Sequence, residues 1–384
     1  MTKRPITLFT GAAFALALAL SAAAEMTQPS EPVTDMMIGS MLMFSFDGTE
    51  LTADDPFLDL VRKGHVGGVT LFNRKPDGSD MNVASPAQLK RLTRTLTEAA
   101  PGPFLIAVDQ EGGRVRRLWP GKGFFDLPSA REMSLGSPAQ TRETAEKLGR
   151  ELRKLGIHVD FAPVVDVNVN PDCPIIGALG RSFGTDERTV SAHAQAFGAG
   201  LTAQGVIPAL KHFPGHGSSR TDSHLGTTDI THTWQKRELF PYVDAIASGW
   251  PGMIMSASLF HARLDPALPG SLSPKVTTDL LRGLLGFKGV IVTDSLLMGA
   301  VTDHYTIEQT VELAVNAGAD ILLFVSSDVY GPELAERAFK ALRALVDSGS
   351  ISHERIRASW RRITALYRRY AAFAPDLYPW KDEI

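Results

Sequence analysis

Short apolar runs rich in β-branched residues alternate with segments of helical periodicity along most of the chain. Each run is bounded by Gly, Pro or Asp, residues that typically punctuate strands. The runs span residues 38–47, 67–72, 103–109, 158–164, 206–213, 252–258, 289–295 and 320–325. Strands that alternate with helices in this way predict βαβ units around a parallel sheet.

The segments between the runs have helical spacing, and several open with Ser, Thr, Asp or Pro and close near Gly. They span residues 87–100, 138–155, 188–204, 235–247, 274–285 and 307–317. Eight strands match a closed barrel, and no glycine-rich phosphate-binding turn follows the first strand, which disfavours an open doubly wound sheet. The pattern therefore predicts an α/β fold, a (β/α)8 barrel of the TIM type, as a single domain over residues 25–384.

Residues 330–373 continue the helical pattern beyond the last strand, with apolar residues three and four positions apart. We expect them to form additional C-terminal helices that pack on the outside of the barrel. No linker rich in Pro, Gly or Ser marks a second domain.

The first 24 residues differ from the rest, because Lys3 and Arg4 precede an uncharged run that ends in Ala22-Ala23-Ala24. This arrangement is typical of a secretory signal peptide, and it predicts a periplasmic or secreted protein. An uncleaved membrane anchor is the alternative, since residues 6–24 approach the length of a membrane span. After cleavage we expect no stable membrane span.

Composition narrows the class of protein. With 44% hydrophobic and 21% charged residues, the chain of 384 residues has the balance of an ordinary globular protein. Its formal charge of −3 becomes −5 when Lys3 and Arg4 are removed with the signal, so nucleic acid is not an expected partner. A single cysteine, Cys173, excludes an internal disulfide. The oligomeric state stays open, with a monomer expected.

Polar residues gather at the ends of the predicted strands, where barrel enzymes carry their active residues. They are Asp109 with Gln110 and Glu111, Asp166 and the later Arg181, Lys211 with His212, and Asp294. A rim of acids and bases without a phosphate loop or cysteine ligands suits a neutral, hydroxyl-rich ligand such as a sugar. The alternative for any one of these carboxylates is a solvated or turn-forming side chain.

Asp294 follows the apolar run "GVIVT", so it emerges from a buried strand into the barrel mouth. A carboxylate in that position is partly desolvated, and we expect Lys211 and Arg181 to keep it ionised. Such a group can act as a nucleophile toward a carbon that develops positive charge.

The segment "KHFPGHGSSRTDSH" carries three histidines, His212, His216 and His224. Pro214 and the glycines around His216 interrupt helix geometry, so His212 and His216 do not share a helix face as zinc ligands do in a metalloprotease. We therefore expect no metal and no cofactor. The sequence also lacks the Gly-x-Ser-x-Gly turn of a serine hydrolase.

Proton transfer explains Asp222-Ser223-His224 better than metal binding does. A carboxylate two residues from an imidazole can accept a hydrogen bond from one ring nitrogen and leave the other nitrogen for a substrate. Gly215, Gly217 and the serines that follow are expected to make this loop mobile. The alternative is an exposed polar loop with incidental histidines.

With these residues in view, the chain resembles glycoside hydrolase family 3, and within it the β-N-acetylglucosaminidases of the peptidoglycan-recycling type. The resemblance runs from about residue 37 to residue 325, in five blocks that keep the same order. These blocks are "AVDQEGGRVRRL" (107–118), "DFAPVVDVN" (160–168), "GRSFGTD" (180–186), "KHFPGHGSSRTDSH" (211–224) and "GVIVTDSLLMGA" (289–300).

The resemblance implies a role for each matching position. It implies that Asp294 is the catalytic nucleophile and that His224 is the acid/base, with Asp222 behind it. Binding of the non-reducing sugar is implied for a second set of residues, namely Asp109, Arg117, Arg181, Lys211 and His212. The implied reaction is retaining hydrolysis of terminal N-acetylglucosamine through a covalent glycosyl-aspartate, with His224 in the place of the usual second carboxylate.

Three alternatives stay open at this stage. Relatives with glucosidase or xylosidase activity lack the Asp-x-His loop, and a phosphorylase would use phosphate in place of water. A sugar-binding barrel without turnover belongs to a different class, although it would not need Asp294 or His224. The exported character of the chain leaves peptidoglycan fragments or chitooligosaccharides as substrates.

Overall fold

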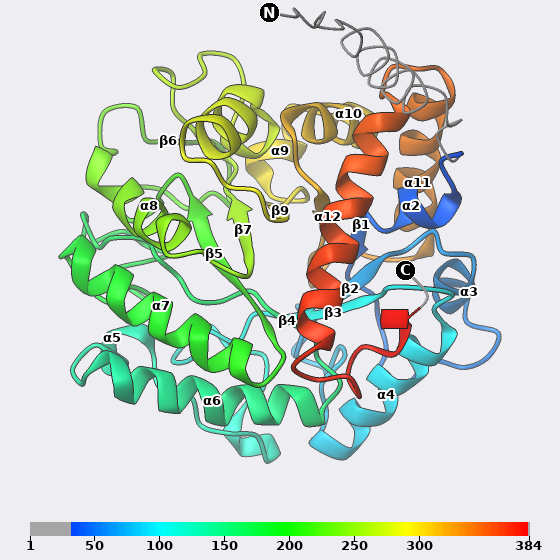
Figure 1. Ribbon diagram of the computed structural model, residues 1–384, viewed down its shortest axis with the longest axis horizontal. Coiled ribbons are helices and arrows are strands. Elements are labelled where there is room, and N and C mark those ends of the chain that lie inside the picture. Colours follow the sequence, from blue (N-terminus) through cyan, green and yellow to red (C-terminus); the bar gives the residue numbers. More distant parts are fainter. Residues whose placement is uncertain (1–31, 383–384) are drawn as a thin grey trace, which may run out of the picture. The chain divides into compact units, whose positions relative to one another are not determined.

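The computed structural model describes residues 32–382, and the expected signal peptide, residues 1–24, lies outside them. From Thr34 onward these residues form one compact unit (Figure 1). None of the described helices is both long enough and apolar enough to span a membrane.

Eight parallel strands within residues 32–382 close into a barrel, in the order β1-β10-β9-β7-β5-β4-β3-β2. Each strand lies inside one of the apolar runs of the sequence, which confirms the predicted barrel. The strands are β1 (Leu42–Phe44), β2 (Gly68–Leu71), β3 (Leu105–Val108), β4 (Val159–Asp160), β5 (Ile207–Phe213), β7 (Met253–Ser256), β9 (Ile291–Ser295) and β10 (Ile321–Phe324). Two further short strands, β6 (Thr228–Asp229) and β8 (Leu259–Phe260), pair with each other outside the barrel.

Helices follow the strands and form the outer layer of the barrel (Figure 1). They are α3 (Pro56–Arg62), α4 (Pro86–Ala99), α6 (Pro138–Lys154), α7 (Glu187–Ala203), α8 (Phe240–Ala247), the π-helix η4 (Lys275–Leu284), α10 (Ile307–Ala317) and α11 (Pro332–Asp347). The predicted start signals are confirmed, since Ser85, Ser137 and Thr306 each cap a helix through their side chains. The sequence pattern missed α3, because its seven residues span only two turns.

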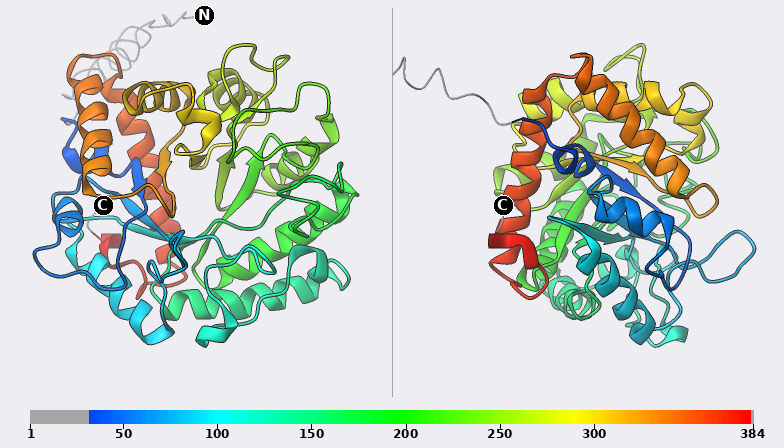
Figure 2. Two further views of the ribbon diagram at one scale, coloured as in Figure 1. Left: turned by 180° about the vertical axis from the view of Figure 1, so that it is seen from behind. Right: turned by 90° about the vertical axis from the view of Figure 1, so that its right-hand side faces the viewer.

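The C-terminal helix α12 (His353–Ala371) packs on the outside of the barrel, as expected. Its side chains bond to residues that precede the strands: Arg355 to the carbonyl of Ala319 before β10, and Arg369 to that of Pro251 before β7. Helix α12 therefore crosses the N-terminal end of the barrel. The right-hand view of Figure 2 shows it, in red, at the left edge of the molecule.

Candidate active site

A cavity of about 590 Å³ lies at the C-terminal ends of the barrel strands. The residues at these ends come from different strands: Asp109 directly follows β3, Lys211 and His212 lie in β5, and Asp294 lies in β9. All eight site residues expected from the sequence line this one cavity: Asp109, Arg117, Arg181, Lys211, His212, Asp222, His224 and Asp294. The opposite, N-terminal end is the one that α12 covers.

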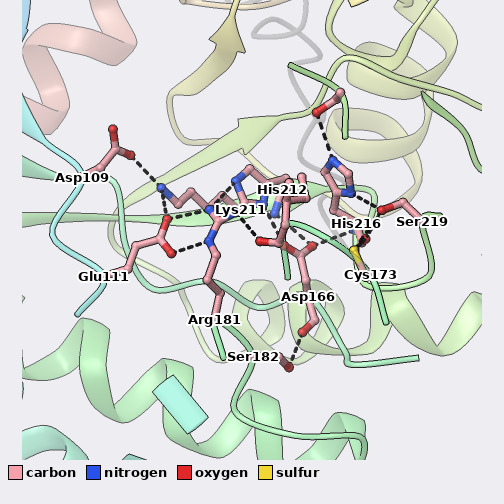
Figure 3. Close-up of polar contacts among 12 residues, drawn as sticks. Asp109, Glu111, Asp166, Cys173, Arg181, Ser182, Lys211, His212, His216 and Ser219 are labelled. Atoms are coloured by element: carbon pink, nitrogen blue, oxygen red, sulfur yellow. Dashed lines mark hydrogen bonds and ion pairs between the residues drawn. The ribbon is translucent and has the colours of Figure 1, made fainter. Parts of the chain in front are cut away.

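A buried ion-pair cluster forms the floor of the cavity (Figure 3). The ammonium group of Lys211 donates to Asp109 Oδ1 at 2.7 Å and to Glu111 Oε1 at 2.7 Å, although its side chain is only 2% exposed. Arg181 donates two parallel hydrogen bonds to Glu111, each 2.7 Å long. Paired hydrogen bonds between a guanidinium and a carboxylate fix the orientation of both groups.

Electrostatics keep these side chains charged. Burial alone would raise the pKa of Glu111, but the nearby Arg181 and Lys211 outweigh it and hold that pKa far below its usual range. For Asp109 the same opposition of burial by Lys211 and Arg117 also lowers the pKa. Burial works against the charge of Lys211, yet Asp109 and Glu111 raise its pKa. The cluster is therefore a set of fixed charges and donors.

The expected partnership of Lys211 and Arg181 with Asp294 is not what the structure contains. Lys211 forms ion pairs with Asp109 and Glu111, and Arg181 forms its ion pair with Glu111. Glu111 pairs with the two cations in place of Asp294. The sequence placed Glu111 at a strand end without a role, and it lies two residues beyond Asp109 on the turn after β3. Asp294 Oδ1 instead accepts a hydrogen bond from the amide of Ser295 at 2.7 Å.

His212 is oriented from both sides. Its Nδ1 lies 2.7 Å from Asp166 Oδ2, and its Nε2 lies 3.2 Å from the Arg181 guanidinium. Because a guanidinium only donates, Nε2 accepts and the ring proton is on Nδ1, facing Asp166. The Asp166 carboxylate is fully buried, and it was a second strand-end residue without an expected role.

Arg117 completes the wall of the cavity on the side of β3. Its guanidinium lies 3.4 Å from Asp109 Oδ2 and stacks over the Phe72 ring, 4.9 Å from the ring centre. The contact with Phe72 holds the planar group in place while leaving it partly exposed to the cavity.

The loop after β5 carries the expected acid–imidazole pair. His224 Nδ1 lies 2.7 Å from Asp222 Oδ1, and the backbone amide of His224 donates to the same oxygen. Burial opposes ionisation of Asp222, but these hydrogen bonds outweigh it and lower the pKa of that carboxyl. The His224 side chain is 60% exposed, and Nε2 is left for another partner.

The glycines of this loop are packed, which contradicts the expectation that they make it mobile. A side chain at Gly217 would meet the carbonyl oxygen of Val167 at 1.8 Å, and one at Gly215 would meet Glu238. Ser218 and Ser219 are also buried. Glycine is thus required here for close packing against the segment that follows β4, and the exposed part of the loop begins at Arg220.

The three histidines of the segment have separate partners: Asp166 for His212, Ser219 for His216 and Asp222 for His224. Among residues 32–382, no group of three His, Cys, Asp or Glu side chains is arranged to hold a metal ion.

Comparison with known proteins decides the family. Residues 33–366 match the family described as "Glycosyl hydrolase family 3 N terminal domain". The chain belongs to glycoside hydrolase family 3. It is 38% identical over 294 residues to "Beta-hexosaminidase LpqI" of Mycobacterium tuberculosis, covering 74% of this chain and 72% of that protein. It is 33% identical over 375 residues to "Beta-hexosaminidase A" of Pseudoalteromonas piscicida, covering 87% of this chain.

Solved structures share the fold. A family 3 β-N-acetylglucosaminidase from Paenibacillus sp. superposes with a TM-score of 0.79 at 37% identity, over 89% of this chain and 63% of that one. A β-N-acetylhexosaminidase from Beutenbergia cavernae gives 0.78 at 31% identity, over 88% of this chain and 99% of that one. The match to this family 3 chain spans 60% of the Pseudoalteromonas protein's length.

Proposed function

We propose that this family 3 protein is a retaining exo-β-N-acetylglucosaminidase, which releases terminal N-acetylglucosamine from the non-reducing end of chitooligosaccharides or peptidoglycan fragments. The observation that carries the proposal is the Asp222–His224 pair on a loop that lines the same cavity as Asp294. The similarity to two beta-hexosaminidases supports it.

In the first step, Asp294 attacks the anomeric carbon while His224 Nε2 gives its proton to the glycosidic oxygen, and the aglycone leaves as an alcohol. In the second step, His224 removes a proton from water, and the resulting hydroxide breaks the glycosyl-aspartate ester. The sugar leaves with its anomeric configuration retained, and both side chains return to their starting states.

Asp222 supports both steps. Its hydrogen bond holds the proton on Nδ1 of His224 and stabilises the imidazolium that forms when His224 takes a proton. The sugar itself is held by the floor and wall of the cavity. Fixed donors and acceptors of Asp109, Arg117, Arg181, Lys211 and His212 suit its hydroxyl and acetamido groups.

The test compares 4-nitrophenyl N-acetyl-β-glucosaminide with the corresponding glucoside, each with and without phosphate. Faster release from the N-acetylglucosaminide, unchanged by phosphate, supports the proposal. Preference for the glucoside would favour a β-glucosidase, and dependence on phosphate with formation of a sugar phosphate would favour a phosphorylase. Binding without release would identify a sugar-binding barrel.

The role of His224 is tested with leaving groups of different acidity. His224→Ala is expected to reduce kcat/KM by about 100-fold for a sugar leaving group and much less for 2,4-dinitrophenolate, which departs without protonation. Equal losses for both substrates would contradict the role of His224 as the acid.

We also propose that the protein is exported, because residues 1–24 have the sequence of a signal peptide. Cell fractionation with terminal sequencing tests this. Mature protein in the periplasm or medium supports export, and full-length protein in the cytoplasm would contradict it.

A further inference from the structure

His216 is the one histidine of the β5 loop that the proposed mechanism does not use. Its ring is buried, and both of its nitrogens have partners. Nδ1 lies 2.7 Å from Ser219 Oγ (Figure 3). Nε2 lies 3.1 Å from Ser223 Oγ. Ser223 stands between Asp222 and His224, so the ring of His216 contacts the centre of the proposed acid/base element.

The backbone of His216 is itself fixed to the barrel. Its amide donates to Asp166 Oδ1 at 2.7 Å, while the other oxygen of the same carboxylate holds the ring of His212. Asp166 therefore contacts both His212, which belongs to the proposed sugar site, and His216, which contacts the acid/base loop through Ser223. These contacts join the segment that follows β4 to β5 and the segment after it, and all three residues are buried.

The hydrogen bonds also give the direction of donation. The Ser219 hydroxyl donates to the His216 carbonyl at 2.9 Å, so its oxygen accepts from Nδ1–H. With the proton on Nδ1, the neutral ring accepts at Nε2, and the Ser223 hydroxyl is the donor. Burial lowers the pKa of His216 to about 4, which keeps the ring neutral at neutral pH.

Ser223 and His224 have opposite exposures. The Ser223 side chain turns inward and the residue is 2% exposed, whereas the neighbouring imidazole of His224 extends outward. A second contact, from the Gly299 amide to the His224 carbonyl, is longer, at 3.3 Å. The Ser223–His216 hydrogen bond is therefore the side-chain link that ties the centre of the loop to the barrel.

We propose that His216 is a positioning residue for the acid/base, acting through Ser223. This rests on the proposed function, because it needs His224 to transfer the proton. Loss of the Ser223 hydroxyl frees the loop, so His224 spends less time at the glycosidic oxygen. Only steps that need its proton are slowed, and the sugar site and Asp294 are unaffected.

The test is kcat/KM of Ser223→Ala on two N-acetylglucosaminides, one with a sugar leaving group and one with 2,4-dinitrophenolate. Losing one hydrogen bond of this kind predicts a fall of about tenfold for the sugar leaving group and less than about twofold for the phenolate. Ser223→Thr keeps the hydroxyl and is expected to restore most of the loss.

Thr227→Val is the matched control, since Thr227 lies in the same loop but bonds to the exposed His304. It is expected to leave kcat/KM unchanged for both substrates. A loss in Thr227→Val equal to that in Ser223→Ala would overturn the proposal, because general loosening of the loop would then explain both.

His224→Ala, measured in parallel, separates failure of this proposal from failure of the proposed function. If His224→Ala discriminates between the leaving groups and Ser223→Ala matches the unsubstituted enzyme, the positioning role of His216 is wrong. If His224→Ala does not discriminate, the proposed acid is wrong and the positioning role falls with it. Selective loss in both variants, with rescue by threonine, is the supporting result.

Discussion

The two ends of the barrel carry similar chemistry in different settings. At the C-terminal end, Asp109 and Glu111 neutralise Lys211 and Arg181 beneath an open cavity. At the N-terminal end, the fully buried Asp320 forms ion pairs with guanidinium groups from η4 and α12, and Ser359 also donates to it.

What differs between the two clusters is their cover. Helix α12 supplies part of the cluster at the N-terminal end and covers the carboxylate of Asp320, which is fully buried, while Arg362 keeps 31% of its side chain exposed. The cluster at the C-terminal end instead lines the open cavity, so its polar atoms can face a ligand. Buried charge at one end of this barrel therefore serves stability, and at the other end it prepares a binding surface.

The largest effect on activity is expected from Asp294→Ala, at the C-terminal end of the barrel. Removal of the proposed nucleophile predicts a fall of about 10⁴-fold in kcat, because no other side chain is proposed to form the glycosyl ester. The melting temperature is expected to stay within about 3 °C, since the ion pairs around the cavity do not include Asp294. Steady-state kinetics and thermal unfolding check both, and unfolding of the variant would break the comparison.

Asp320→Asn, at the N-terminal end of the barrel, should show the opposite pattern: a loss of stability with little change in activity. It leaves Arg282, Arg355 and Arg362 without their shared carboxylate, which predicts a loss of about 4 kcal/mol in the free energy of unfolding. The folded variant is expected to keep kcat/KM within about twofold. Urea titration and kinetics below the unfolding transition measure the two quantities. Loss of activity without loss of stability would show that the two ends are coupled.

Glu238 sharpens the comparison, because it is a buried carboxyl behind the sugar site. Burial raises its pKa from 4.5 to about 7, although the Gln235 amide donates to Oε1. The folded state holds this proton more tightly than the unfolded state, so the contribution to stability is complete below pH 4.5 and is lost as pH rises toward 7.

Glu238→Gln removes that dependence and keeps the acceptor oxygen. Relative to the unsubstituted protein, it is expected to gain up to about 3 kcal/mol of stability by pH 8 and nothing at pH 4. Unfolding free energies across this range test the prediction. Parallel curves for the two proteins would contradict the raised pKa.

Much of the fold could be predicted from the sequence, because apolar runs and capping residues act locally. Ser85 and Gln88, for example, form the two hydrogen bonds of one capping box within a single turn. The position of α12 could not be predicted in this way. Its apolar spacing indicates a buried face but not which surface it packs on, and its partners, such as Asp320, are distant in sequence.

The site shows the same division. Strand ends bring Asp109, Lys211 and Asp294 to one cavity, as expected from parallel strands. Which charges pair there depends on side-chain reach across the barrel, and Glu111 took the place expected for Asp294. The glycines of the β5 loop indicate that the backbone there needs residues without a side chain. Only the packing against Val167 shows that the reason is close contact and not loop movement.

The most direct test of the account is to trap the covalent intermediate. C2 of the sugar carries the acetamido group, so the fluorine that slows both steps is placed at C5. A 5-fluoro N-acetylglucosaminyl fluoride also has a good leaving group, which lets the ester form. Mass spectrometry of the digested protein should find the fluorosugar on the peptide that contains Asp294, and no label on Asp294→Ala. Label on a different side chain would contradict the account.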